Sequence, residues 1–145
     1  MISIVFLGKY SGETQYNFLN NAVKKYFAKR GVQTKMVLFV DQKKLPEHLS
    51  QGQTITFLCR KDLNLFKKWN SQTAKKELLE QHDLLVSMVF NSTSFLDNFI
   101  KESKAKMKVG IQGSSSYPFD LEIIQNTEDV EALFEKIKKY LIKLK

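Results

Sequence analysis

The sequence contains little cysteine, proline or arginine, and it has no long apolar run. Its single cysteine among 145 residues, Cys59, excludes an internal disulfide and a multi-cysteine zinc site, so a reducing cytoplasm is the expected compartment. No stretch approaches the roughly 18 apolar residues of a membrane span. Met1 leads directly into a strand-like segment and not into a signal peptide. We therefore expect no membrane partner.

The remaining composition is that of an ordinary globular domain with excess positive charge. Hydrophobic residues make up 43% of the chain and charged residues 26%, which excludes a disordered tail and a coiled-coil rod. The net charge is +8, but of the 23 basic residues only Arg30 and Arg60 are arginine. Arginine suits bidentate phosphate contacts, whereas these lysines are scattered along the chain. A solvated lysine-rich surface is therefore our interpretation, with nucleic-acid binding as the alternative.

Hydrophobic periodicity divides the chain into alternating strands and helices. The expected strands are residues 2–7, 35–40, 54–59, 84–89, 107–111 and 119–124, and the expected helices are residues 13–30, 71–81, 95–100 and 127–144. Such alternation predicts a mostly parallel sheet with helices on both faces. We predict one α/β domain over residues 1–145, in three layers with about six strands, flavodoxin-like or Rossmann-like.

Two details concern the end of the chain. Only residues 112–118 separate the last two strands, which is too few for the usual parallel crossover, so the sixth strand is expected to run antiparallel or to leave its neighbour. Thr127 is the expected cap of the final helix. The apolar stripe of that helix, from Val130 to Leu144, could lie on a membrane, but packing on the sheet is the interpretation we prefer.

Ligands of open parallel sheets bind beyond the carboxyl ends of the strands, which directs attention to the loop after the first strand. Its candidate anion-binding residues are Lys9, Ser11, Gly12 and Thr14. Residues 11–14 resemble the phosphate loop of flavodoxins, and this resemblance implies FMN as a cofactor. Glu13 departs from that pattern, and no later segment matches the loops that flank the flavin. The competing interpretation is an ordinary turn with Ser11 as helix cap.

A second candidate loop follows the fourth strand. It consists of Asn91, Ser92, Thr93 and Ser94, which either hold a phosphate or carboxylate or serve as redundant helix caps. Residues 112–116 form a third polar loop, which we interpret as flexible.

No catalytic constellation is evident. Neither His48 nor His82 has a partner nearby in the sequence, and Cys59 is interpreted as a buried small hydrophobe although Arg60 and Lys61 follow it. Three aspartates begin or follow strands and have no assigned role: Asp62, Asp83 and Asp120.

The C-terminal two-thirds contains four distinctive segments, residues 61–64, 83–86, 103–110 and 119–123, followed by a terminal helix ending in Tyr140-Leu141. In their order and spacing these segments resemble a bacterial domain-of-unknown-function family of small single-domain proteins. The resemblance implies a Rossmann-like α/β structure and a bacterial cytoplasmic origin, and it carries over no catalytic residue. The order of Asp83, a helix and a lysine-rich strand ending at Gly110 is also similar to the N-terminal half of heptosyltransferases. Those enzymes need a second domain, for which this chain is too short.

Together these observations favour a cytoplasmic binding or accessory module that is not an enzyme. The expected partner is a small anionic ligand, bound at the strand carboxyl ends, or another protein. A flavodoxin-like redox protein with FMN is the first alternative and a nucleic-acid-binding protein the second. The chain is expected to be a monomer or a homodimer.

Overall fold

A computed structural model describes residues 1–143 of the chain. The elements in order are β1 (Ile2–Lys9), α1 (Glu13–Phe27), β2 (Val32–Val40), β3 (Ile55–Cys59), the short 3-10 helix η1 (Arg60–Asp62), α2 (Gln72–Leu79), β4 (Leu84–Ser87), α3 (Ser94–Glu102), β5 (Met107–Ile111), β6 (Leu121–Ile123) and α4 (Val130–Lys143).

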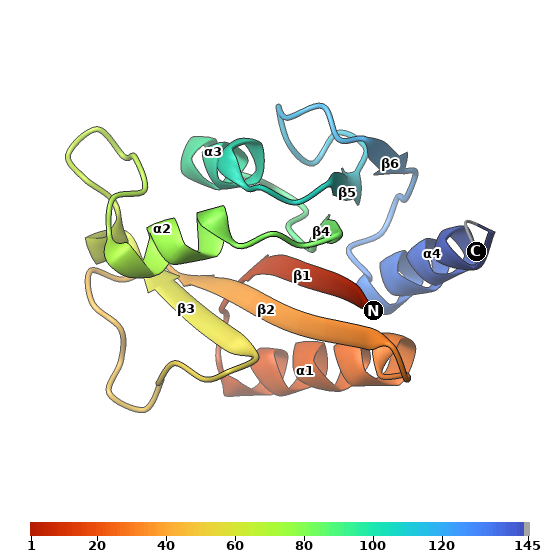
Figure 1. Ribbon diagram of the computed structural model, residues 1–145. Coiled ribbons are helices and arrows are strands. Elements are labelled where there is room, and N and C mark those ends of the chain that lie inside the picture. The colour runs from red at the N-terminus through yellow and green to blue at the C-terminus, as the bar shows by residue number, and fades with distance from the viewer. Residues whose placement is uncertain (144–145) are drawn as a thin grey trace.

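The strands form one sheet in the order β3-β2-β1-β4-β5-β6, and every neighbouring pair is parallel. Figure 1 shows α1 and α4 on one face of this sheet and α2 and α3 on the other. The predicted three-layer α/β architecture is therefore confirmed. The order coincides with that of doubly wound dinucleotide-binding sheets and differs from the 2-1-3-4-5 order of flavodoxin-like sheets. A strand order alone does not assign a function.

Alternating side chains of the buried strands build one core on each face of the sheet. In β1, Phe6 faces the core that α1 and α4 cover, while Val5 and Leu7 face the core beneath α2 and α3. β1 pairs with both β2 and β4, so it lies at the centre of the sheet. Strands covered on both faces read as continuous apolar runs, which explains why this part of the fold was predictable.

The expected antiparallel sixth strand is wrong, because β6 runs parallel to β5. The two strands pair only from Val109 with Leu121 to Ile111 with Ile123. Because this overlap is so short, the chain has to travel only a short distance from the end of β5 back to the start of β6. An extended loop covers this distance without a helix. Gly110 lets the loop pack closely, since a Cβ at this position would lie 2.3 Å from the Phe119 ring.

Side-chain hydrogen bonds cap the starts of α2 and α4. Ser71 caps α2, because its Oγ accepts a hydrogen bond from the Ala74 amide at 3.0 Å. The expected Thr127 cap is wrong. Asp129 Oδ1 instead accepts from the Glu131 amide at 3.0 Å, and a carboxylate at this end also complements the helix dipole. The predicted apolar stripe of α4 packs against the sheet, and its last member, Leu144, lies outside the described residues.

Candidate functional site: the cleft between β1 and β4

The sheet changes direction between its two central strands. After β1 the chain builds β2 and then β3 outward on one side, and it then returns to place β4 on the other side of β1. The loops that follow β1 and β4 therefore leave the same edge of the sheet in opposite directions. Such a switch point is where open α/β sheets form ligand crevices.

A cavity of about 230 Å³ lies at this switch point. Its polar lining consists of Lys9, Ser11, Gln15, Asn91 and Glu128, and its apolar lining includes Leu19, Met88, Phe90 and Val130. The cavity thus joins the two loops that the sequence had marked as candidates. Of the eight candidate residues, Lys9, Ser11 and Asn91 line it.

Lys9 is the side chain that connects the two loops. Its Nζ donates a hydrogen bond to the Asn91 carbonyl oxygen at 2.8 Å. Asn91 Nδ2 in turn lies 3.5 Å from Glu128 Oε1, at the entrance to α4. The cavity mouth therefore carries an ammonium group, an amide and a carboxylate within one chain of contacts.

The loop after β1 is shaped by Gly12 and Gln15. Gly12 precedes α1 with φ of 107°, a backbone conformation that favours glycine, and no side chain caps the helix. The expected Ser11 cap is therefore wrong. The Ser11 amide donates to Gln15 Oε1 at 3.2 Å, and Gln15 Nε2 donates to the Lys9 carbonyl oxygen at 3.3 Å. The Gln15 side chain thus forms hydrogen bonds with two backbone groups of this loop. Thr14 is exposed, and it lines neither this cavity nor the adjacent cavity described below.

In the loop after β4, Thr93 lines a second cavity, whereas Ser92 contacts the loop of residues 112–116. Thr93 precedes α3 without capping it, and its buried Oγ1 makes no hydrogen bond. It lines an adjacent cavity of about 210 Å³ together with Lys9, Ser11 and Asp41. The Ser92 amide donates to the Ser114 carbonyl oxygen at 2.9 Å, and Ser94 is exposed.

The third polar loop, residues 112–116, is held by hydrogen bonds to α3. The Asp97 carboxylate accepts hydrogen bonds from the Ser115 hydroxyl and, at 2.7 Å, from the Ser116 hydroxyl. Burial raises the pKa of Asp97, but hydrogen bonds from Ser115, Ser92 and Ser116 outweigh this effect and lower it overall. These hydroxyls therefore stabilise a carboxylate, contrary to our interpretation of the segment as a flexible loop.

The residues present do not fit FMN. A flavin phosphate would need the amides of the loop after β1, but the Ser11 amide is bonded to Gln15 and the Glu13 carboxylate lies beside Tyr10. Glu128 adds a second carboxylate to the cavity lining. Cavities of about 230 and 210 Å³ are also smaller than the roughly 300–1,000 Å³ of typical cofactor pockets.

The three aspartates without an assigned role all hold backbone amides. Asp62 accepts from the Cys59 amide, Asp83 from the Ser3 amide and Asp120 from the Lys108 amide, each at 2.8 Å. Each carboxylate therefore fixes a strand end or the turn beside it.

Cys59 is buried and His48 is exposed, and neither belongs to a group arranged to hold a metal ion within the described residues. Cys59 is 3% exposed, and burial raises the pKa of its thiol, which disfavours the reactive thiolate. His48 is exposed in the loop between β2 and β3. Across residues 1–143, no group of three or more His, Cys, Asp or Glu side chains is arranged to hold a metal ion. The helices in the same range include none long and apolar enough to cross a bilayer.

His82 belongs to a second polar region at the opposite, amino-terminal edge of the sheet. Its ring is 4% exposed, Nδ1 lies 2.8 Å from Ser3 Oγ, and Nε2 lies 3.7 Å from Glu80 Oε2. Burial lowers the pKa of His82, and Glu80 and Glu77 only partly offset this effect. The folded protein therefore favours the neutral imidazole.

This burial predicts a loss of stability in mild acid. As the pH falls below about 6.5, unfolded His82 takes up a proton before folded His82 does. The stabilisation is therefore complete above that pH and is lost as the pH falls towards the lower folded-state pKa, with a slope of at most about 1.4 kcal/mol per pH unit. Urea unfolding between pH 7.5 and 5 measures this slope. His82→Gln should flatten it, whereas a similar flattening by the exposed-site control His48→Gln would contradict the assignment.

Sequence reasoning missed two polar residues of the cleft, Gln15 and Glu128. Gln15 stands three positions after the Gly12 cap, the spacing at which a glutamine side chain reaches back to a backbone amide, so its contact could have been predicted. Glu128 enters from the approach to α4, and no signal near β1 or β4 points to it.

Comparison with known proteins identifies a family for this chain but no activity. Searches among curated proteins and among solved structures found no significant match. One protein-family model matches residues 2–144, almost the whole length. The chain therefore belongs to the family of unknown function DUF6913, as the resemblance in its C-terminal two-thirds implied.

Proposed function

We propose that this protein binds a small anionic ligand in the cleft between β1 and β4 and acts as a binding or accessory module, not as an enzyme. The observation that carries the proposal is the position of Lys9, whose ammonium group lies in the switch-point cavity beside the uncapped start of α1. The positive end of the α1 dipole favours an anion near the ammonium group.

The other residues that line the cavity limit the chemical class of ligand that fits. Glu128 would repel an anion placed directly against it, but it accepts hydrogen bonds from hydroxyl or amino groups. The ligand that fits best therefore carries a phosphate or carboxylate towards Lys9 and a hydrogen-bond donor towards Glu128. Leu19 and Phe90 add apolar side chains to the lining of the same cavity. A cavity of about 230 Å³ accommodates a small metabolite.

Two further points concern the cellular location of the protein and the flavin alternative. We propose a cytoplasmic location, because Cys59 is a free thiol, as is usual in a reducing compartment. The Ser11–Gln15 hydrogen bond and the Glu128 carboxylate do not support the flavin alternative, which predicts yellow protein with flavin absorbance.

Titration of ¹⁵N-labelled protein with inorganic phosphate and with small hydroxycarboxylates, at constant ionic strength, tests the site. Amide shifts are expected at residues 11–15 and 91–93, and Lys9→Met should weaken binding about tenfold, the loss of one charge-assisted hydrogen bond. Lys24→Met, which removes an exposed lysine near the far end of α1, is the matched control. Shifts spread over the whole surface, or equal effects of the two substitutions, would contradict the proposal.

A further inference from the structure

Between β3 and α2 the chain forms a small hairpin, residues 63–69, that projects from the end of the molecule (Figure 1). Leu63 and Trp69 form an antiparallel bridge at its base, and the Asn64 amide donates to the Lys68 carbonyl oxygen at 2.9 Å. Asn64 Oδ1 accepts hydrogen bonds from the amides of Phe66 and Lys68 at 2.9 and 3.1 Å. The turn therefore has a defined conformation before it meets any partner.

The base of the hairpin is anchored in the core. Trp69 is 6% exposed, and its indole Nε1 donates a hydrogen bond to the Phe95 carbonyl oxygen at 2.7 Å. Its ring packs edge-on against Phe39 and Phe99. Because the base is held in this way, the tip keeps its position relative to the rest of the domain.

The tip exposes two large apolar side chains next to each other. Leu65 is 98% exposed and Phe66 is 82% exposed. Single exposed apolar residues are ordinary, but two adjacent ones at the tip of an ordered projection form a surface that gains free energy when it leaves water. Neither side chain contributes to the two cores of the domain.

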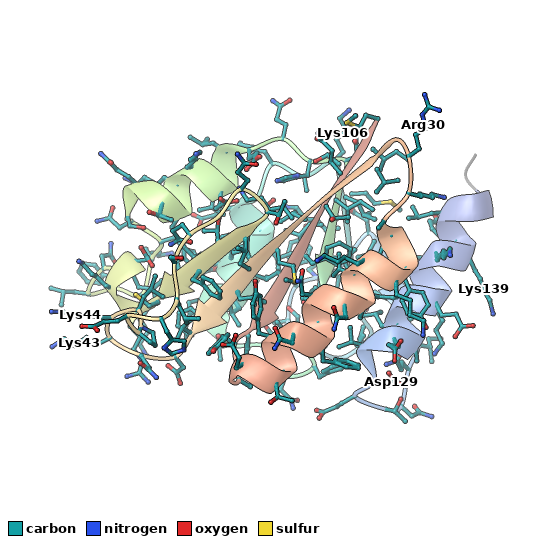
Figure 2. All side chains as sticks on the ribbon, turned by 90° about the horizontal axis from the view of Figure 1, so that it is seen from below. Arg30, Lys43, Lys44, Lys106, Asp129 and Lys139 are labelled. Carbon is teal, nitrogen blue, oxygen red and sulfur yellow. The ribbon has the colours of Figure 1, made fainter. Side chains whose placement is uncertain are left out.

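Cations surround this apolar tip. Lys67 and Lys68 follow it directly and are exposed. At the base of the hairpin, Leu63 lines a cavity of about 570 Å³ together with a basic cluster composed of Lys43, Lys44, Arg60 and Lys61. Figure 2 shows Lys43 and Lys44 projecting from the same end of the molecule. Of the cluster, Arg60 is paired with Asp41 at 2.7 Å.

We propose that this end of the molecule docks on an anionic lipid surface. Leu65 and Phe66 would enter the boundary between headgroups and acyl chains, while the lysines behind them contact the anionic headgroups. Contact of this kind requires no membrane-spanning helix. It departs from the expectation of no membrane partner, which was based on the absence of a long apolar run and did not consider contact at a membrane surface.

The pair at the tip favours lipid over nucleic acid as the partner. Single-stranded nucleic acid stacks its bases on aromatic rings beside a basic groove, and Phe66 could serve in this way. Leu65, the more exposed of the two, has no role in stacking, whereas a lipid interface accommodates both side chains. The lysine-dominated cluster also suits non-directional attraction to a charged surface better than bidentate phosphate recognition.

Co-sedimentation with phospholipid vesicles tests the proposal on the full chain. Binding is expected to vesicles rich in phosphatidylglycerol, to be much weaker with phosphatidylcholine alone, and to fall as salt increases. Leu65→Ser with Phe66→Ser should reduce the affinity at least about tenfold. Lys67→Ala with Lys68→Ala should reduce it about fivefold or more. These side chains are exposed, so the variants should retain the fold.

Matched controls remove the same chemistry elsewhere. Leu79 and Ile124 are 67% and 72% exposed, so Leu79→Ser with Ile124→Ser removes two exposed apolar residues away from the tip. Lys24→Ala with Lys139→Ala removes two exposed lysines from α1 and α4, away from the hairpin (Figure 1). Both double variants should bind vesicles like the unaltered protein. Equal binding to both kinds of vesicle, unchanged binding by the tip variant, or binding of a single-stranded oligonucleotide without vesicle binding would each overturn the proposal.

Discussion

Replacing Lys35 with methionine is expected to lower the free energy of unfolding by about 3–5 kcal/mol, because it leaves a buried carboxylate without its counter-charge. Lys35 Nζ lies 2.7 Å from Glu77 Oε1 and 3.2 Å from Glu80 Oε2. Thr56 Oγ1 donates to the same Glu77 oxygen at 2.7 Å. Burial opposes the charge on Lys35, but the two glutamates outweigh it and raise its pKa. Glu77, on α2, is only 5% exposed.

Urea unfolding at neutral pH measures this loss, and two further variants interpret it. The double substitution Lys35→Met with Glu77→Gln should cost less than the sum of the single substitutions, since the uncompensated charge is removed with its partner. Lys25→Met breaks the exposed pair of Lys25 and Glu131, whose side chains are 65% and 34% exposed, and should cost far less than Lys35→Met. If Lys35→Met costs no more than Lys25→Met, the buried pair does not hold α2 to the sheet as we describe.

Phe134→Ala is expected to cost about 3–5 kcal/mol for a different reason, the loss of packed volume. Phe134 is fully buried, and its ring centroid lies 5.1 Å from that of Phe6 and 5.2 Å from that of Phe27. These three rings join α4, β1 and α1. Because no neighbour can fill the space of a phenyl ring without moving one of these elements, a cavity should remain.

Thermal or urea unfolding of Phe134→Ala and Phe134→Leu checks this expectation. The leucine variant should recover a large part of the lost stability, since it refills much of the volume. Phe18→Ala is the control, because Phe18 on α1 is 46% exposed and should contribute little. A Phe134→Ala effect as small as that of Phe18→Ala would mean that α4 contributes little to the stability of the domain.

The strands and helices were predictable because burial on both faces leaves an uninterrupted apolar pattern, as in residues 2–7 and 84–87. The prediction for β2 began at residue 35, whereas the strand begins at Val32 and pairs with β1 from Ile2 onward. Polar residues such as Gln33 conceal the start of that strand, because ladder hydrogen bonds require no apolar side chain. The predicted antiparallel direction of β6 was wrong for a related reason. The prediction assumed that the loop must be as long as a full parallel crossover, but β6 is only three residues long, so a short loop is sufficient.

The location of the candidate cleft followed from topology, but its detailed contacts did not. Sequence reasoning placed Lys9 and Asn91 at strand carboxyl ends, and the structure brings them together at 2.8 Å. The roles of individual hydroxyls were not predictable. Whether Ser92 or Ser115 meets a ligand or the Asp97 carboxylate depends on how three separate loops converge, and sequence spacing does not contain that information.

The central position of β1 has a consequence for the order in which the chain can fold. One edge of β1 can pair with β2 as soon as residue 40 is available, whereas its other edge must wait for β4, near residue 87. During synthesis, half of the sheet can therefore assemble with an apolar strand edge open to solvent. Such an edge invites pairing with other chains, so the interval before β4 emerges is when nascent molecules are most exposed to aggregation and most in need of a chaperone.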